Sequence, residues 1–355
     1  MKILVSALEH SANIHLKSLK KELSDDVEFI GIFDRDLGDS IVDLRALAIM
    51  GFVDALKKLF FFIKLNNQML DLAKDADKIL LIDSSGFNLP LAKKIKKKYP
   101  HKEIIYYILP QAWAWKKKRI PVLEKTIDHL ASILPFEKDY YSKTAPITYV
   151  GHPLLDQICE FKESINSEVK KVVFMPGSRK GEIKKLLPIF RELQKELDIE
   201  SIIIIPKHFS KEDIKEVYGS LAGFKIAHDT HKTLLEADFA FICSGTATLE
   251  ASLIGTPFIL TYIAKRLDYF IASRLVKLEY IGLANIMFSK FKGEVLHPEF
   301  IQEDVTLENL LKSYHEYDRE KFLSDSKALR GYLEHGSSKT VAEILVKPLI
   351  TRIKN

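Results

Sequence analysis

Two strand-to-helix turns in the second half of the chain have the residue types that bind phosphate. The first is "FMPGSRKGEI" (174–183). There Gly177 permits a tight turn and the close approach of a ligand, Ser178 can cap the helix, and Arg179 offers a planar cation suited to phosphate. The free N–H groups at a helix start also favour an anion. An ordinary capped helix with a surface arginine would look the same, so this turn alone decides nothing.

The second turn, "FICSGTATLEASLIGTPFI" (241–259), repeats this arrangement. Glu250 lies one helical turn beyond its small residues, where it can accept hydrogen bonds from a ribose diol; a helix cap with a surface glutamate is the alternative. Two such turns in one half-chain favour a shared nucleotide diphosphate. Neither turn is a P-loop or reads GxGxxG, which argues against an ATPase or a dinucleotide enzyme. The small residues that present backbone donors are Ser244, Gly245, Thr246 and Ala247.

Acid–base candidates lie in the first half of the chain. "LLIDSSGFN" (80–88) places Asp83 at the end of a strand, and "SALEHSANIHL" (6–16) places Glu9 after the first strand. A carboxylate at the carboxyl end of a strand that borders a cleft is a candidate general base. We predict Asp83 as the base, with Glu9 as its alternative or orienting partner. An Asx turn or a helix cap would explain Asp83 equally well.

Two further segments combine apolar and basic residues. "RALAIMGFVDALKKLFFFIKL" (45–65) is apolar on nearly every face at its start, so it is either a core helix or a helix that meets lipid. "LPQAWAWKKKRI" (109–120) joins both tryptophans to four cations, as interfacial surfaces do, although a core pair before a solvated helix would also fit. Together they predict an acceptor or membrane surface formed by Met50, Phe52, Phe60, Phe61, Phe62, Trp113, Trp115, Lys116, Lys117, Lys118 and Arg119.

The elements that must position these residues alternate between strand and helix, which indicates parallel sheets covered on both faces. Two such sets indicate an α/β chain of two facing Rossmann-like doubly wound domains, with ligands in the cleft at the carboxyl ends of the strands. One large continuous sheet is the alternative. The expected strands are 2–7, 27–33, 78–83, 103–109, 130–134, 171–176, 201–206, 224–227, 239–243 and 257–262. The expected helices include 11–22, 44–65, 89–98, 179–196, 246–254, 265–277 and a tail from about 307.

The composition is that of a globular chain with a mild preference for anionic partners. Of its 355 residues, 47% are hydrophobic and 28% charged, and the formal net charge is +5. No apolar run approaches the ~18 residues that span a bilayer, and the N-terminus becomes polar too soon for a secretory signal. Cys159 and Cys243 have neither disulfide nor metal-ligand spacing, so we expect no cofactor and no metal. The cations lack interleaved aromatic residues, which argues against nucleic acid.

Taken together, these motifs resemble the lipid-A-disaccharide synthases, which are glycosyltransferases of the GT-B type. The resemblance runs from residue 47 to 286, and "SALEHSAN" extends it to the N-terminus. The stretches that carry it are "LAIMGFVDAL", "IDSSGFN", "PQAWAW", "LPFE", "VGHPL", "PGSRKGEI", "SGTATLE" and "RLVKLEYIGLANI".

The resemblance implies a cytoplasmic enzyme held peripherally on the anionic inner face of a Gram-negative inner membrane. It would transfer the sugar of UDP-2,3-diacylglucosamine to the 6-hydroxyl of 2,3-diacylglucosamine 1-phosphate, giving a β-1,6-linked disaccharide and UDP. By the same resemblance, Asp83 is the acid–base aspartate, Glu9 the N-terminal glutamate, Arg179 the pyrophosphate arginine and Asn285 a donor-site asparagine.

The domains expected on this basis are an acceptor-binding, membrane-facing domain at 1–155 and a UDP-sugar domain at 156–335. Residues 336–355 would form a C-terminal helix able to pack back on the first domain. The oligomeric state is left open. A UDP-N-acetylglucosamine epimerase with the same fold, or a non-catalytic membrane-docking UDP-sugar sensor, are the alternatives.

The sequence departs from the family pattern on the acceptor side. The first turn of the family usually reads Gly-Glu-x-Ser-Gly-Asp, whereas this chain has Leu8, Ala12 and Asn13 at the two glycines and the final acid. Family members also often carry a second aspartate three residues after the one that matches Asp83, where this chain has Gly86.

Overall fold

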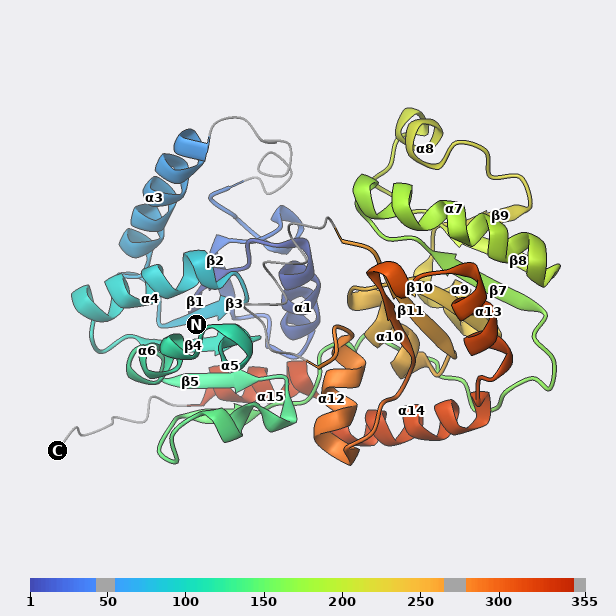
Figure 1. Cartoon of the computed structure of the whole chain (residues 1–355). Coiled ribbons are helices and arrows are strands. Elements are labelled where there is room, and N and C mark those ends of the chain that lie inside the picture. The colour runs from blue at the N-terminus through green and yellow to red at the C-terminus, as the bar shows by residue number, and fades with distance from the viewer. Residues whose placement is uncertain (43–54, 265–278, 348–355) are drawn as a thin grey trace. The chain divides into compact units, whose positions relative to one another are not determined.

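The strands of the described residues form two six-stranded sheets, and every pair of neighbouring strands is parallel (Figure 1). The structure, a computed structural model, describes residues 1–42, 55–264 and 279–347. Met50, Phe52 and the predicted helix 265–277 lie outside the described residues. The chain divides into two units, one of Met1–Gln157 with Leu333–Asn355 and one of Ile158–Tyr332. The prediction of two parallel, doubly wound sheets is therefore confirmed, and the alternative of one continuous sheet is wrong.

The sheet of the first unit has the strand order β2-β1-β3-β4-β5-β6. Its strands are β1 (Lys2–Ser6), β2 (Glu28–Ile32), β3 (Lys78–Ile82), β4 (Glu103–Tyr107), β5 (His129–Ser132) and β6 (Ile147–Tyr149). Its helices are α1 (His10–Lys21), α3 (Ala55–Leu72), α4 (Ser85–Lys98), α5 (Ala112–Trp115), α6 (Ile120–Thr126) and α15 (Ser337–Val346), with 3₁₀ turns η1 (Arg35–Leu37), η2 (Lys117–Arg119) and η3 (Pro135–Tyr140).

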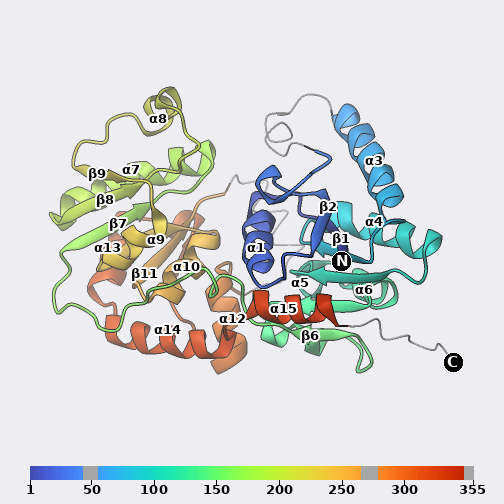
Figure 2. The ribbon, with the colours of Figure 1, turned by 180° about the vertical axis from the view of Figure 1, so that it is seen from behind.

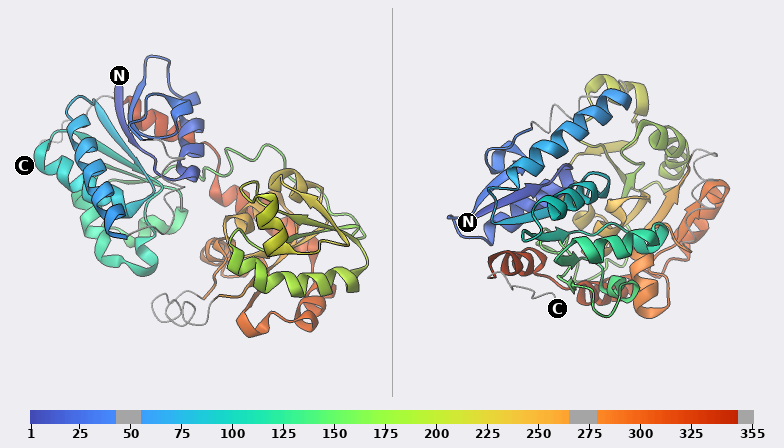
Figure 3. Two further views of the ribbon diagram at one scale, coloured as in Figure 1. Left: turned by 90° about the horizontal axis from the view of Figure 1, so that it is seen from above. Right: turned by 90° about the vertical axis from the view of Figure 1, so that its left-hand side faces the viewer.

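Helices cover both faces of this sheet because its central strands are apolar on both sides (Figures 2 and 3). In β4, Ile104 and Tyr106 face the core below α3, α4 and α6, whereas Ile105 and Tyr107 face the core below α1 and α15. This alternation is the two-residue period of a strand. The last helix, α15, lies against α1 in the first unit, although it follows the second unit in sequence.

The sheet of the second unit has the strand order β12-β11-β10-β7-β8-β9. Its strands are β7 (Lys171–Met175), β8 (Glu200–Ile204), β9 (Phe224–Ala227), β10 (Phe239–Cys243), β11 (Phe258–Tyr262) and β12 (Glu299–Ile301). Its helices are α7 (Lys180–Leu197), α8 (Lys211–Tyr218), α9 (Thr230–Glu236), α10 (Thr246–Ile254), α12 (Leu283–Lys292), α13 (Leu307–His315) and α14 (Arg319–Leu333), with the turn η4 (Gln302–Asp304).

Each sheet has a switch point, which is the place where the strand order reverses. The connections on its two sides run in opposite directions across the sheet. The switch point lies between β1 and β3 in the first unit and between β7 and β10 in the second. Open parallel sheets bind ligands beyond the carboxyl ends of the strands at this point, because the loops on the two sides separate there. The fold thus singles out four turns, and all four are turns that the sequence analysis selected.

Candidate functional site

The turn after β7 is built to bring its backbone close to a ligand. Gly177 has φ 111°, and a side chain there would place its Cβ 2.7 Å from Glu182 Oε2 and 3.2 Å from Cys243 Sγ. Helix α7 begins with Arg179 as its N-cap, and no side chain caps it. The expected cap at Ser178 is therefore wrong: Ser178 is exposed and lies before the N-cap. The first N–H groups of α7 are left without a side-chain cap, as an anion site requires.

The Arg179 side chain is oriented by a neighbouring carboxylate. Its side chain is 79% exposed, and its Nη1 donates a hydrogen bond to Glu182 Oε1 at 2.7 Å. Glu182 lies in the first turn of α7, so a single carboxylate fills the space beside Gly177 and orients the guanidinium. An exposed cation at the start of a helix is suited to bind a diphosphate.

The turn after β10 leaves a second helix start open. Gly245 is the N-cap of α10 with no side-chain cap, and a Cβ at Gly245 would meet no atom within 4 Å. Gly245 and Thr246 are exposed, while Ser244 and Ala247 are half-buried. Because β7 and β10 are hydrogen-bonded neighbours, the two turns lie on either side of the switch point of this sheet.

Glu250 lies on the first turns of α10, largely removed from water. Burial, together with the charge of Asp229, raises the pKa of the Glu250 carboxyl to about 7. His231 Nδ1 is 3.9 Å from Glu250 Oε1. Glu250 thus lies one turn after the open start of α10, and its role at a ribose stays a prediction.

Asn285 has a different environment from the one that was expected. It is fully buried, and its amide makes four hydrogen bonds within the second unit. Nδ2 donates to His297 O (2.9 Å) and Glu299 Oε1 (2.8 Å), and Oδ1 accepts from the backbone N–H groups of Leu296 (2.8 Å) and His297 (3.1 Å). A side-chain amide can donate two hydrogen bonds and accept two, so all four are used. In this arrangement Asn285 fastens α12 to the segment before β12 and has no group left for a ligand.

The first unit brings the two predicted acids together. Glu9 follows β1 as the N-cap of α1, and Asp83 follows the neighbouring strand β3. Ser84 Oγ donates to Glu9 Oε1 at 3.1 Å, which ties the two turns. Burial first, and then the charge of Glu9, raises the pKa of the half-buried Asp83 carboxyl above its usual range. A carboxylate whose pKa is raised in this way is a better general base.

Asn13 explains one departure from the family pattern. Its Nδ2 donates to Ala7 O and Glu9 O, both at 2.8 Å, and its Oδ1 accepts from Asp34 N at 2.6 Å. A carboxylate at this position could not donate, so the asparagine holds the backbone of Glu9 in a way that an aspartate could not. The other departure, Gly86, faces open space: a Cβ there would meet no atom within 4 Å.

The aromatic and basic segment after β4 contributes to two environments. Trp113 is 4% exposed and packs edge-on against Phe136, with ring centroids 5.0 Å apart. Its side chain is therefore part of the packed interior of the first unit and not of its surface. Lys117 and Lys118 are exposed. Arg119, which was expected at the acceptor or membrane surface, donates from Nη1 to Ser85 Oγ at 2.8 Å. Ser85 is the first residue of α4 and lies two residues after Asp83, so the Arg119 side chain reaches the start of this helix.

The remaining surface residues are partly outside the description. The side chain of Trp115 lies outside the described residues, as do Met50 and Phe52. Lys116 is half-buried. On α3, Phe60 is 67%, Ile63 46% and Phe62 37% exposed, whereas Phe61 packs against the core. Of the three phenylalanines predicted at this surface, Phe60 and Phe62 are thus exposed, whereas the prediction for Phe61 is wrong because its ring packs against the core.

Two residues beside Asp83 were missed by the sequence analysis. The Tyr106 hydroxyl and Asn88 Nδ2 both donate to the Asp83 carbonyl oxygen. Asn88 is part of "IDSSGFN", where its position five residues after Asp83 was a usable signal. Tyr106 is one residue of an apolar strand, and nothing in its sequence neighbourhood marks it.

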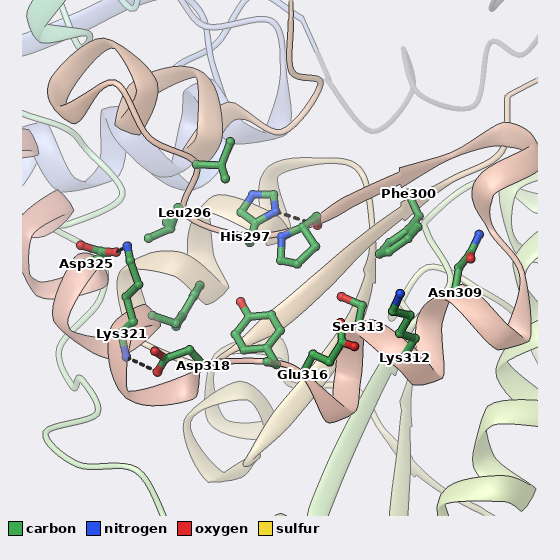
Figure 4. A pocket seen from close by; sticks show the side chains of 14 residues that line it. Leu296, His297, Phe300, Asn309, Lys312, Ser313, Glu316, Asp318, Lys321 and Asp325 are labelled. Carbon is green, nitrogen blue, oxygen red and sulfur yellow. Dashed lines mark hydrogen bonds and ion pairs between the residues drawn. The ribbon is translucent and has the colours of Figure 1, made fainter.

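A pocket of about 710 Å³ in the second unit is separate from these turns (Figure 4). It is lined by the segment that leads into β12 and by residues of α13 and α14, including His297, Phe300, Lys312 and the ion-paired Lys321 and Asp325. None of the predicted site residues lines it.

The part of the chain that the structure describes has no group of three or more His, Cys, Asp or Glu residues able to hold a metal ion. Within the same residues, no helix has both the length and the apolar character needed to cross a membrane.

Comparison with known proteins identifies a family. Residues 3–342 match the family model described as lipid-A-disaccharide synthetase. The lipid-A-disaccharide synthase of Helicobacter pylori strain J99 is 51% identical over 354 residues, which cover 96% of this chain and 97% of that protein. The enzyme of the same name from Campylobacter jejuni strain RM1221 is 47% identical over 363 residues, covering 96% and 98%.

Solved structures with low sequence identity share the fold. The UDP-GlcNAc 2-epimerase of Neisseria meningitidis, solved with UDP-GlcNAc bound, has a TM-score of 0.59 at 13% identity and covers 98% of this chain and all of its own. Acinetobacter baumannii MurG has a TM-score of 0.59 at 11% identity, covering 97% and 98%. At these identities the likeness concerns the GT-B fold alone.

Proposed function

Because the chain belongs to the lipid-A-disaccharide synthase family, we propose that it joins UDP-2,3-diacylglucosamine to 2,3-diacylglucosamine 1-phosphate by inverting transfer. It is a glycosyltransferase of lipid A biosynthesis that uses a UDP-sugar. Our proposal goes beyond the family in three respects: the two diacylated substrates, the roles of individual residues, and the contact with the membrane. The observation that carries the proposal is the placement of a carboxylate pair at the switch point of one sheet and of two open helix starts at that of the other.

The second unit has the chemistry to hold the departing UDP. Arg179 and the open starts of α7 and α10 present positive charge and N–H donors at adjacent strand ends. Negative charge grows on the diphosphate as its bond to the anomeric carbon breaks, so these groups stabilise the transition state more than the bound substrate. Glu250 would accept or donate hydrogen bonds at the ribose. We propose that the transfer needs no metal, which predicts unchanged turnover in a chelating buffer.

The first unit has the chemistry to activate the acceptor. Asp83 takes the proton of the acceptor 6-hydroxyl while that oxygen forms a bond to the anomeric carbon of the donor. The bond from this carbon to the diphosphate oxygen breaks on the opposite face, and its electron pair leaves with UDP. The configuration is therefore inverted, and Asp83 ends protonated.

Arg119 is placed to bind the phosphate of the acceptor. It reaches the start of α4, whose N-cap Ser84 makes no side-chain cap hydrogen bond, so cation and helix start adjoin Asp83. Both features favour an anion. Of the two roles that the sequence left open for these cations, this assignment gives Arg119 the acceptor phosphate and leaves Lys117 and Lys118 for lipid headgroups.

The lipid surface that we propose combines α3 with neighbouring cations. Phe60, Phe62 and Ile63 are exposed on α3, and α4 packs beside it, with Lys94 Nζ donating to Asn67 Oδ1 at 2.8 Å. Exposed apolar side chains beside lysines suit an anionic bilayer surface. Diacylated substrates also reside in such a bilayer, so the acceptor would reach the first unit from the lipid.

The decisive experiment supplies both diacylated substrates and reads the products by mass spectrometry. The expected result is a disaccharide 1-phosphate, with UDP released only when both substrates are present. UDP release with the donor alone would contradict transfer to the acceptor, and UDP-sugar binding without turnover would indicate a sensor. Formation of a mannosamine epimer from UDP-N-acetylglucosamine would instead favour the epimerase alternative.

A further inference from the structure

The backbone at the proposed base is in an unusual conformation. Asp83 has φ 49° and Ser84 has φ 40°, so two consecutive residues with side chains occupy the left-handed region. This region is unfavourable for residues other than glycine, and a pair of them persists only where surrounding contacts impose it. These two residues connect the end of β3 to the start of α4. Their backbone conformation therefore sets the direction in which the Asp83 side chain points away from the sheet.

Three hydrogen bonds between Asp83 and buried groups impose this conformation. The Asp83 N–H donates to Tyr107 O at 3.1 Å. The Asp83 carbonyl oxygen accepts from Asn88 Nδ2 at 2.8 Å and also from the Tyr106 hydroxyl. A carbonyl oxygen has two lone pairs, so both are used. The peptide group that follows Asp83 is therefore fixed from two directions, by a helix residue and by the neighbouring strand.

Asn88 is itself held rigidly. Its side chain is fully buried, its Nδ2 also donates to Ile82 O at 3.1 Å, and its Oδ1 accepts from Ser6 Oγ at 2.6 Å. Ser6 is the last residue of β1, so this one amide links the ends of β1 and β3 to the start of α4. The turns that carry Glu9 and Asp83 are thereby kept in a fixed relation.

We propose that Tyr106 and Asn88 are positioning residues, which act through the Asp83 carbonyl to aim its carboxylate at the acceptor hydroxyl. This inference rests on the proposed role of Asp83 as the base. Neither residue touches substrate. Their effect is on the orientation of the base, and small errors in orientation are costly in a proton-transfer step.

The neighbouring Tyr107 provides a matched control. Both tyrosines are fully buried on β4, and each hydroxyl forms a hydrogen bond to one partner across the core. Tyr106 points to the Asp83 side of the sheet, whereas the Tyr107 hydroxyl lies 2.7 Å from Ser337 Oγ of α15, on the other face. Tyr106→Phe and Tyr107→Phe therefore remove the same atom from adjacent residues. The backbone carbonyl of Tyr107, which accepts from the Asp83 N–H, is kept in Tyr107→Phe, so only the Tyr106 hydroxyl acts on the base.

The test measures kcat and KM of the full-length enzyme with both substrates, beside thermal stability. Tyr106→Phe should lower kcat about tenfold while KM for the UDP-sugar stays within about twofold, and Tyr107→Phe should keep kcat within about twofold at a comparable loss of thermal stability. Asn88→Ser, which leaves the Asp83 and Ile82 carbonyls without their amide donor, should give an equal or larger loss of kcat. Equal kcat for the two phenylalanine variants, or losses that follow thermal stability alone, would overturn the inference.

Asp83→Asn separates a failure of this inference from a failure of the proposed function. If Asp83→Asn retains turnover, Asp83 is not the base and the proposed mechanism is wrong. If it abolishes most of the turnover while Tyr106→Phe equals Tyr107→Phe, the base is right and the positioning role is wrong. Adding Tyr106→Phe to Asp83→Asn should lower the residual rate no further, because a residue that acts through Asp83 has nothing left to orient.

Discussion

Asp83 and Glu9 form an acid pair in which one carboxylate adjusts the other. The pKa of Asp83 is raised by burial and by the charge of Glu9. A base must be deprotonated, so activity is lost as pH falls through this pKa. Removing the charge of Glu9 lowers the pKa of Asp83, and Glu9→Gln should therefore move the acidic limb of the kcat/KM profile to lower pH.

The control for this prediction is Glu22→Gln, the same chemical change at the exposed C-cap of α1. It should leave the profile unchanged, because Glu22 lies at the opposite end of the helix from the acid pair. A collapse of kcat at every pH in Glu9→Gln would show instead that Glu9 is the base.

Gly177 offers a second prediction at the scale of one residue. In Gly177→Ala the new methyl group would lie 2.7 Å from Glu182 Oε2 in a backbone with φ 111°. The turn must then shift, and the Glu182 carboxylate that orients Arg179 must shift with it. We expect UDP binding, measured by calorimetry, to weaken at least about tenfold, with a loss of stability of about 1–3 kcal/mol.

Gly181 is the matched control, since it lies four residues later in the first turn of α7. A Cβ there meets no atom within 4 Å, and its φ is not positive. Gly181→Ala should raise the thermal stability slightly, because alanine is favoured over glycine in a helix by about 1 kcal/mol. A Gly177→Ala protein as stable as this control would contradict the packing argument.

Sequence reasoning selected candidate residues in turns, and it missed Tyr106, which lies in strand β4, and Asn88, which lies in helix α4. Asp83, Glu9 and Arg179 were recognisable because each is a charged residue that closely follows an apolar run predicted to be a buried strand. Tyr106 was hidden because its ring satisfies the strand pattern, while the hydroxyl that reaches Asp83 leaves no trace in that pattern. Arg119 was grouped with its lysine neighbours because adjacency in sequence does not tell which side chain turns inward.

At the scale of elements, α15 is held by a residue far away in sequence. Asp156 Oδ1 accepts from Gly336 N at 2.7 Å, and Oδ2 accepts from Ser338 N at 2.8 Å, so one carboxylate caps the start of the helix. At the other end, Lys78 Nζ donates to Lys347 O at 2.6 Å. The last helix is therefore fastened at both ends to the first unit.

This arrangement predicts a graded loss in variants of Asp156. Asp156→Ala should destabilise α15 by about 2 kcal/mol, and Asp156→Asn by roughly half as much, because an amide oxygen can still accept one of the two bonds. Hydrogen exchange of the peptide that covers α15 should accelerate in the same order. Equal exchange in all three proteins would show that the cap contributes nothing to holding the helix.

The elements themselves were predictable wherever burial was complete. β3, β4 and β10 are buried throughout and stood out as unbroken apolar runs. The three-residue strands β6 and β12 were missed because so short a run has no pattern. The start of α4 was predicted at residue 89, whereas the helix begins at Ser85 and contains Pro90 in its first half.

At the scale of the whole molecule, charge and exposed apolar surface act together. The formal net charge of +5 attracts the chain to any anionic surface, but a bilayer-docking face requires a local arrangement. Lys117→Glu with Lys118→Glu lowers the net charge from +5 to +1, since each reversal changes it by two. If these lysines meet headgroups, binding to anionic vesicles should fall at least about tenfold, at roughly 1 kcal/mol per cation.

Lys207→Glu with Lys211→Glu changes the net charge by the same amount at exposed positions of the second unit, before and at the start of α8. Vesicle binding should fall much less in this control, because general attraction is screened over about 10 Å in 0.1 M salt. Equal losses in the two lysine pairs would mean that net charge alone attracts the enzyme to lipid and that Lys117 and Lys118 have no local role.

Phe60→Ser should weaken partitioning into neutral and anionic vesicles alike, whereas Ile226→Ser, which changes a 52% exposed residue of β9, should not. Unchanged partitioning of Phe60→Ser would contradict the proposed role of α3.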